Sequence, residues 1–218
     1  MDAGREAPPR RRRKEARPAE LVAAGLAEFA RHGYAATRLE DVARRAGVAK
    51  GTIYRYFADK EALFLAAVRT EVAPVFDEVV GLVDAYPGTT RDLLGLLIGA
   101  VHRQLVGSEL RVLMRVIIAE GERFPALTEH YYAETVSKGR ALLERIVARG
   151  LSRGEVRPGA AADLPLVVVA PAIMAALWRM TFDRHAHIDA EAFLAAHLDL
   201  VCDGLLRPDP GGASGAGR

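Results

Sequence analysis

The sequence predicts an all-α protein made of two helical domains, with about nine helices in all. Apolar residues recur at helical spacing through most of the chain, and the strict alternation typical of strands is absent. Short segments rich in glycine and proline separate the helical stretches, as they do in helical bundles. Half of the 218 residues are hydrophobic, so a sizeable core can form.

The two ends of the chain differ in composition from the rest. Residues 1–16 contain the basic run "RRRRK" and few apolar side chains, which predicts a disordered basic arm. Residues 207–218 are rich in glycine and proline and are also expected to be disordered. The folded part then divides into a head at residues 17–64 and a body at residues 65–206.

The head is predicted to begin with a helix from Pro18 to His32. Proline suits a first helical turn, and Gly33 suits the position just past the helix end. A short second helix follows from Leu39 to Ala46, with small and apolar residues on its inner face. The pattern therefore indicates two helices that pack closely together.

The start and end of the second helix are marked by local signals. Thr37 is a plausible N-cap, and Glu40 three residues later completes a capping-box pattern. Gly47 is expected to end the helix. A third short helix is expected from Lys50 to Phe57, so that a tight glycine turn joins the two.

A fourth helix, which Asp59 is expected to cap, runs from the end of the head into the body, to about Asp84, with a bend at Pro74. Further helices are expected at residues 91–106, 109–122, 125–152, 163–184 and 189–206. Helices of this length joined by short loops predict an all-α bundle.

Charge is distributed unevenly along the chain. Residues 1–70 carry 15 Lys and Arg against 9 Asp and Glu, whereas residues 71–218 carry 15 against 19. A basic first third indicates that this part meets an anion. Two short helices joined by a glycine turn are a helix-turn-helix, whose second helix enters the major groove of DNA.

The side chains of the third helix fit contact with DNA. Lysine and arginine pair with phosphate or guanine, threonine contacts phosphate or a thymine methyl, and tyrosine packs at a groove wall. Ile53 and Phe57 point the other way and anchor the helix. The predicted DNA contacts are Thr37, Lys50, Gly51, Thr52, Tyr54, Arg55, Tyr56 and Lys60. On spacing alone, a small bundle with half-buried tyrosines remains an alternative.

Residues 18–68 resemble the DNA-binding domain of the TetR/AcrR family of transcriptional regulators. The match is ungapped and has two departures. Ala49 stands where the family often has serine, and Glu28 replaces a common apolar residue and is expected to face solvent. The matching positions are Phe29, Gly33, Tyr34, Thr37, Val42, Ala43, Ala46, Gly47, Val48, Gly51, Thr52, Tyr54, Tyr56, Phe57, Lys60 and Leu63.

This resemblance implies a homodimeric repressor with one helix-turn-helix in each subunit. A small-molecule effector would bind in the C-terminal body and release a palindromic operator. Residues 114–132 look like the effector-domain segment of AefR-like or AcrR-like regulators. The basic arm lies beside the head, where it either follows DNA or remains a solvated tail.

Two sets of apolar residues in the body are candidates for binding. Large aromatic and methionine side chains suit an adaptable ligand pocket, although a core role is open for each. The pocket candidates are His102, Met114, Tyr131, Tyr132, Trp178 and Phe182. Apolar surfaces on the last two long helices predict a dimer interface, with an intramolecular core as the alternative. These residues are Leu164, Val168, Ile173, Leu177, Phe193, Leu194, His197, Leu198 and Val201.

Other classes of site have little support in the sequence. His185 and His187 lie near aspartates, but the segment reads as an exposed turn, so we expect neither a metal site nor a cofactor. No catalytic motif is convincing, and we expect no enzyme activity. The single cysteine and the absence of a secretory signal or membrane span predict a cytoplasmic protein. The alternative function is a helical ligand-binding protein or enzyme that does not read DNA.

Overall fold

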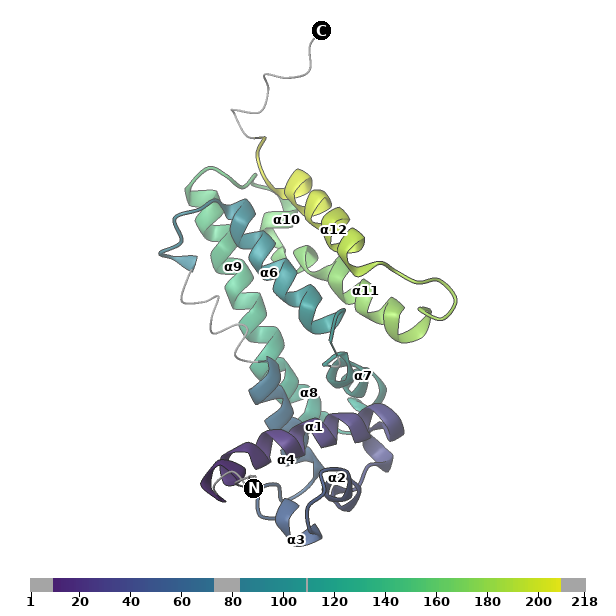
Figure 1. The fold of residues 1–218 in the computed structure, drawn as a ribbon. Coiled ribbons are helices and arrows are strands. Elements are labelled where there is room, and N and C mark those ends of the chain that lie inside the picture. Colours follow the sequence, from purple (N-terminus) through teal and green to yellow (C-terminus); the bar gives the residue numbers. More distant parts are fainter. Residues whose placement is uncertain (1–9, 73–82, 109, 209–218) are drawn as a thin grey trace, which may run out of the picture.

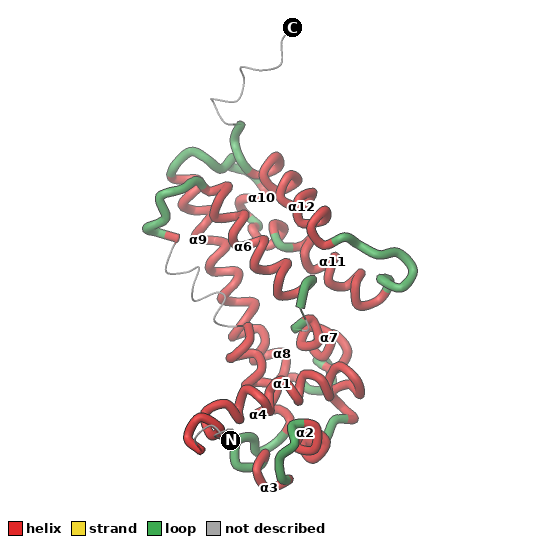
Figure 2. The backbone as a smooth tube through the Cα atoms, viewed as in Figure 1, coloured by secondary structure: helices red, strands yellow, loops and turns green. Residues whose placement is uncertain are grey.

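A computed structural model describes residues 10–72, 83–108 and 110–208 of the chain. The molecule is elongated, with α1 to α4 at one end, the other long helices at the opposite end, and α7 and α8 between them (Figure 1). Helices and loops account for the described residues (Figure 2), and the β-type pairing reported for them is one isolated bridge between Val156 and Leu206. The predicted all-α fold is confirmed.

Helix α1 spans Arg10–Ala36 and begins earlier than the sequence predicts. Residues 10–16, expected as part of a disordered arm, are helical here, and Arg, Lys, Glu and Ala are all good helix formers. Residues 1–9 lie outside the described residues. The helix is interrupted at Gly33, whose φ of 76° is a conformation that glycine adopts readily.

The helix-turn-helix consists of α2, Leu39–Arg45, and α3, Lys50–Ile53. The capping-box prediction for α2 is wrong, because Arg38 is the N-cap and no side chain caps the helix. The hydroxyl of Thr37 instead donates to the carbonyl of Gly33 at 2.7 Å, and this side chain is buried. Thr37 therefore ties the end of α1 to the loop and is not presented to DNA.

Helix α4 spans Lys60–Ala67 and is capped as predicted, with the Asp59 carboxylate accepting from the backbone N–H of Ala62 at 2.8 Å. A π-helical turn, η1, continues it over Val68–Val72. The predicted continuation and the bend at Pro74 lie outside the described residues.

The body begins with α6, Thr90–Leu105, and α7, Arg111–Glu120. Three consecutive segments then form the long helix predicted at residues 125–152: α8, Pro125–Tyr131, the π-helical η2, Tyr132–Val136, and α9, Ser137–Ser152. A π-helical segment widens a helix locally and is frequent at functional sites.

The helix predicted at residues 163–184 is broken into three pieces. These are α10, Ala160–Asp163, the 3₁₀ segment η3, Pro165–Val168, and α11, Ala170–Thr181. A proline occupies the first turn of both η3 and α11, where its missing N–H is tolerated, whereas inside a helix it would remove a hydrogen bond. The last helix, α12, Ala190–Leu205, follows the prediction closely.

Three hydrophobic clusters hold the described residues together, and two of them are large. The first contains the apolar faces of α1 to α4 together with residues of α7 and α8, such as Leu113, Val116 and Leu127. Its centre is the fully buried Phe29 and Phe64, whose rings lie 6.3 Å apart. The second core joins α6, α9 and α12. Helices α7 and α8 therefore share a core with the head, although they belong to the body in sequence.

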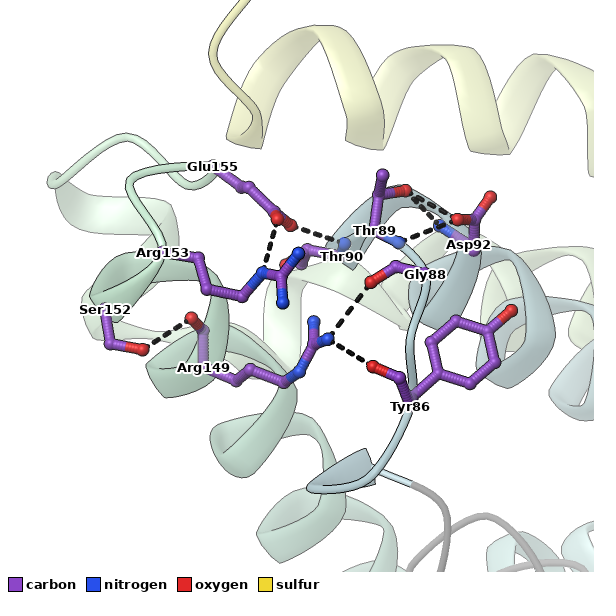
Figure 3. A network of polar contacts seen from close by, with 9 residues as sticks. All are labelled: Tyr86, Gly88, Thr89, Thr90, Asp92, Arg149, Ser152, Arg153 and Glu155. Carbon is purple, nitrogen blue, oxygen red and sulfur yellow. Dashed lines mark hydrogen bonds and ion pairs between the residues drawn. The ribbon is translucent and has the colours of Figure 1, made fainter.

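A polar network fixes the body at its far end from the head (Figure 3). The Glu155 carboxylate accepts from the backbone N–H of Thr90 at 2.6 Å and pairs with Arg153 at 2.6 Å. Arg149 donates to the carbonyls of Tyr86 and Gly88 at 2.7 and 3.0 Å. Burial raises the pKa of Glu155, but the hydrogen bonds outweigh burial and lower it to about 2. The network ties the start of α6 to the end of α9.

Candidate DNA-reading head and effector cavity

The turn between α2 and α3 is set by two backbone hydrogen bonds. The N–H of Val48 donates to the carbonyl of Ala43 at 2.9 Å, and the N–H of Gly47 donates to that of Arg44 at 3.2 Å. This pair of bonds is the Schellman motif, which places the residue after the helix in the left-handed region. Gly47 has a φ of 67°, so its predicted role as the end of α2 is confirmed.

Helix α3 presents one face to the protein and one to solvent. Ile53 is fully buried and Phe57 nearly so, which confirms their predicted role as anchors. The predicted contact residues lie on the other side. Among them Lys50, Gly51, Tyr54 and Arg55 are exposed, and Thr52 and Tyr56 are half-buried. The backbone N–H of Arg55 donates to the carbonyl of Thr52 at 3.2 Å, but its guanidinium has no partner among the described residues and is available to a phosphate or a base.

Glu40 of α2 holds two of the predicted contact residues in the free protein. Its Oε1 atom lies 2.9 Å from Nζ of Lys50 and accepts from the hydroxyl of Tyr54 at 2.9 Å. The Lys50 ammonium lowers the pKa of Glu40 to about 2. A phosphate that approaches Lys50 must therefore compete with this carboxylate, an arrangement that the sequence did not predict.

Lys60 is placed differently from the prediction. Its ammonium donates to the backbone carbonyls of Tyr34 and Ala35, both at 2.8 Å, and lies 4.6 Å from the centre of the Tyr34 ring. Burial lowers the pKa of Lys60. The side chain thus closes the segment after Gly33 onto the start of α4. Two of its three N–H donors are committed to this role rather than to phosphate.

Glu28 is buried rather than exposed, so that expectation is wrong. Its carboxylate lies 2.5 Å from Nε of Arg45 and 3.6 Å from Nε2 of His32. The pair satisfies a charge that would be costly to bury alone. Because Arg45 lies in the last turn of α2, the contact fixes α2 against α1. The sequence did contain a signal for this contact, because Glu28 is a charged residue at a position where an apolar one was expected, and such a residue needs a partner when it is buried.

A cavity of 170 Å³ lies in the body between α6, α9 and the segment from η3 to α11. Its wall is almost entirely apolar, with residues such as Leu97, Leu143 and Ile173. Met114 of α7 and Tyr131 of α8 also line it, as the sequence predicted. Burial raises the pKa of Tyr131 to about 12, so its phenol stays neutral. The cavity is therefore suited to an apolar ligand.

Three further residues give the cavity its polar character, and the sequence analysis missed them. Gln104 and Thr135 line the wall, as does Arg140, which is exposed and pairs with Glu144 at 2.7 Å. The signal for Gln104 was a lone polar residue on the apolar face of α6. Thr135 gave no such signal, because its position depends on the π-helical turn.

The other four predicted pocket residues do not line this cavity. Tyr132 and Phe182 are exposed, and Trp178 donates to the carbonyl of Ala186 at 2.7 Å. Each lies on a helix that reaches the cavity, but on another face of it. Helical spacing alone did not determine which face would line the cavity.

His102, the fourth of these predicted pocket residues, instead forms a buried pair with His197. Nε2 of His102 lies 3.0 Å from Nδ1 of His197, whose Nε2 lies 2.8 Å from the carbonyl of Val168. A carbonyl only accepts, so His197 donates through Nε2 and accepts through Nδ1. Burial lowers the pKa of His102 to about 4, and burial also lowers that of His197. Both rings are neutral near pH 7.

The predicted dimer residues separate into two groups. Val168, His197 and Val201 are buried within the protomer, so they belong to its core. Leu164 and Ile173 are exposed, and Leu177, Phe193, Leu194 and Leu198 are half-buried. The prediction did not include four exposed apolar residues of η3, α11 and α12: Leu166, Val167, Met174 and Leu200. The regular apolar stripe did not reveal which side of each helix faces inward.

Within the described residues, no group of three or more His, Cys, Asp or Glu side chains is arranged to hold a metal ion. Nδ1 of His187 lies 3.1 Å from a carboxylate oxygen of Asp183, which accounts for that pair in the exposed turn. No described helix is both long and apolar enough to cross a membrane.

A helix-turn-helix head joined to an all-α body with an apolar cavity defines a DNA-binding transcriptional regulator. Residues 21–67 match the family of bacterial regulatory proteins called the tetR family, and residues 87–201 match the tetracyclin repressor-like C-terminal domain. The chain belongs to the TetR family of transcriptional regulators, and it is not an enzyme.

Related proteins agree with this assignment. An uncharacterized HTH-type transcriptional regulator of Mycobacterium tuberculosis is 31% identical over 147 residues, which cover 67% of this chain and 69% of the relative. A putative regulator from Saccharomonospora viridis, solved with choline, has a TM-score of 0.73 at 18% identity, covering 89% of this chain and 100% of that one. FadR from Bacillus subtilis, solved with stearoyl-CoA, has a TM-score of 0.68 at 21% identity, covering 85% and 98%. These two structures support the fold.

Proposed function

We propose that the protein is a repressor that binds a palindromic operator as a homodimer and is released by a small hydrophobic or amphipathic effector. The observation that carries the proposal is the double role of α7 and α8. Val112 and Leu127 belong to the core of the head, whereas Met114 and Tyr131 on the same two helices line the cavity. An effector in the cavity therefore contacts the helices on which the head is mounted.

The proposed operator contacts come from Lys50, Thr52, Tyr54, Arg55 and Tyr56. Their placement on α3 and on the turn that follows it, away from the buried Ile53, supports this assignment. Removing a side chain that contacts phosphate lowers affinity for all sequences, whereas removing one that reads a base relaxes sequence preference. We assign Lys50 to the first class and Arg55 to the second.

The proposed dimer interface is the exposed apolar surface of η3, α11 and α12. Leu164, Val167, Met174 and Leu200 are between 46% and 67% exposed in the protomer. Large exposed apolar side chains on adjoining segments are typical of an interaction surface. Two-fold symmetry of such a dimer would place the two heads on the two halves of a palindrome.

We further assign the chain to the cytoplasm and to the AefR-like subgroup, the latter on residues 114–132.

The test is selection of DNA fragments from the source genome by the purified full-length protein, followed by sequencing. We expect a small set of fragments that share a palindrome and are released at high salt. Arg55→Ala should relax the shared sequence, and Lys50→Ala should weaken binding to every fragment. Absence of enrichment at low salt would favour the alternative, a helical ligand-binding protein that does not read DNA.

A further inference from the structure

Two residues that line the cavity have buried polar atoms without hydrogen-bond partners. Oε1 of Gln104 and Oγ1 of Thr135 are both buried and accept or donate no hydrogen bond within the protein. Among the described residues, five buried side-chain polar atoms lack a partner, and two of these five belong to residues that line this one cavity. Buried polar atoms are normally hydrogen-bonded, so each exception calls for an explanation.

The hydroxyl of Thr135 is unusual among the hydroxyls of this chain. Those of Thr70, Ser137 and Thr181 each donate to the carbonyl four residues earlier, at 2.8, 2.7 and 2.7 Å. Thr135 makes no such bond, although it also lies within a helical stretch. Thr135 lies in the π-helical η2, unlike Ser137 and Thr181, which lie in α-helices. Such π-helical turns are frequent at functional sites.

Gln104 lines the same cavity as Thr135. Its Nε2 atom donates to the carbonyl of Glu71, in η1, at 3.4 Å. Because η1 packs against η2, the amide of Gln104 is brought toward the segment that carries Thr135. The contact with Glu71 uses the donor side of the amide, which leaves Oε1 as an acceptor.

We propose that this pair of atoms selects an effector carrying a hydroxyl group, and that the effector is a small neutral phenol or alcohol with an apolar body. Its hydroxyl would donate to Oε1 of Gln104 and accept from the hydroxyl of Thr135. A carboxylate or ketone only accepts, and it would place an acceptor against Oε1. An ammonium could donate to both oxygens, but none of the described residues that line the cavity has an anionic side chain to balance its charge.

The size and charge of the cavity agree with this class of ligand. A cavity of 170 Å³ is close to the volume that holds a single aromatic ring. The only charged residue among those that line it is Arg140, which is exposed and already paired with Glu144. The buried end of the ligand is therefore neutral. This inference rests on the proposed function, because it treats the cavity as the effector site.

The test compares three probes of similar shape with the full-length protein: 4-ethylphenol, 4-ethyltoluene and 4-ethylanisole. The first donates and accepts, the second does neither, and the third only accepts. We expect 4-ethylphenol to raise the thermal unfolding temperature and, by calorimetry, to bind about tenfold or more tightly than 4-ethyltoluene. 4-Ethylanisole should bind no more tightly than 4-ethyltoluene.

Two variants separate recognition from folding. Thr135→Val removes an unpartnered hydroxyl, so the ligand-free protein should be at least as stable, yet the preference for 4-ethylphenol should fall severalfold. Thr181→Val is the matched control, because that hydroxyl bonds within its own helix outside the cavity. It should keep the full preference.

Equal binding of 4-ethylphenol and 4-ethyltoluene, or no binding of any probe, would overturn the hydroxyl inference. DNA selection by the same preparation without a probe is a separate measurement. Failure of the probes with retained DNA binding removes only this inference. Failure of DNA binding with retained preference for 4-ethylphenol removes the proposed repressor function instead.

Discussion

The reading head and the effector cavity differ in whether their polar side chains have hydrogen-bond partners in the free protein. In the head, Lys50 and Tyr54 are already bound to Glu40, and Lys60 is bound to backbone carbonyls. In the cavity, Gln104 and Thr135 keep buried atoms without partners. Under the proposed function, the head would exchange existing partners when it meets DNA, whereas the cavity would gain partners when it meets a ligand. Stability and recognition are coupled differently in the two regions.

The largest expected effect is loss of the core that joins the head to α7 and α8. Phe64→Ala should lower the free energy of unfolding by about 3–5 kcal/mol, because it empties a fully buried site. Urea titration followed by circular dichroism measures this change. Phe64→Leu is the graded control and should cost distinctly less, since it fills more of the space. Equal, small losses for both variants would show that the head and α7 do not share a core.

The buried histidine pair tests the interior of the body. The pKa of His102 is lowered to about 4, so below pH 6.5 the unfolded chain takes up a proton before the folded chain does. Its contribution to stability is present above pH 6.5 and is lost as the pH falls toward 4, by roughly 3 kcal/mol. Urea titrations across this range should show that loss. His102→Gln should flatten the dependence.

Alanine variants of Lys50 and Lys60 distinguish a side chain that contacts DNA from one that stabilises the head. Lys60→Ala removes two hydrogen bonds from a cation to backbone carbonyls, and it should lower the free energy of unfolding by about 1–2 kcal/mol. Lys50→Ala removes only an exposed ion pair and should leave stability close to that of the wild type. Its DNA affinity should fall. A reversal of the two stability effects would contradict the placement of Lys60.

The smallest expected effect concerns the carboxylate that competes with DNA. Glu40→Gln keeps an acceptor for Tyr54 but frees the Lys50 ammonium, so DNA affinity should rise severalfold. The slope of log affinity against log salt should become steeper by about one, as expected for one further phosphate contact. Fluorescence anisotropy at several salt concentrations gives both values. Weaker binding with an unchanged slope would mean that Glu40 positions Tyr54 for DNA rather than restraining Lys50.

The same contrast explains what the sequence could predict. The head follows from local signals, such as Gly47 at the turn and Asp59 at the start of α4, and these agree with the structure. Glu28 and Lys60 were misjudged because their partners lie 17, 25 and 26 residues away in sequence. Local pattern contains no information on such contacts.

The cavity was harder to predict for a related reason. Helical periodicity identifies the apolar stripe of α6 but not which neighbour covers it, so His102 was assigned to the pocket and Gln104 was missed. Prolines at 165 and 171 were visible in the sequence, and they account for the division of the predicted helix at residues 163–184. The π-helical turn that carries Thr135 has no comparable signal.

The central claim is that a ligand in the cavity changes how the head binds DNA. The most direct test is fluorescence anisotropy with a DNA fragment that the protein itself selects, measured with and without saturating 4-ethylphenol. We predict weaker DNA binding in the presence of this probe for the wild type, and a smaller change at the same probe concentration for Thr135→Val. An unchanged DNA affinity, under conditions where calorimetry shows the probe bound, would contradict the claim.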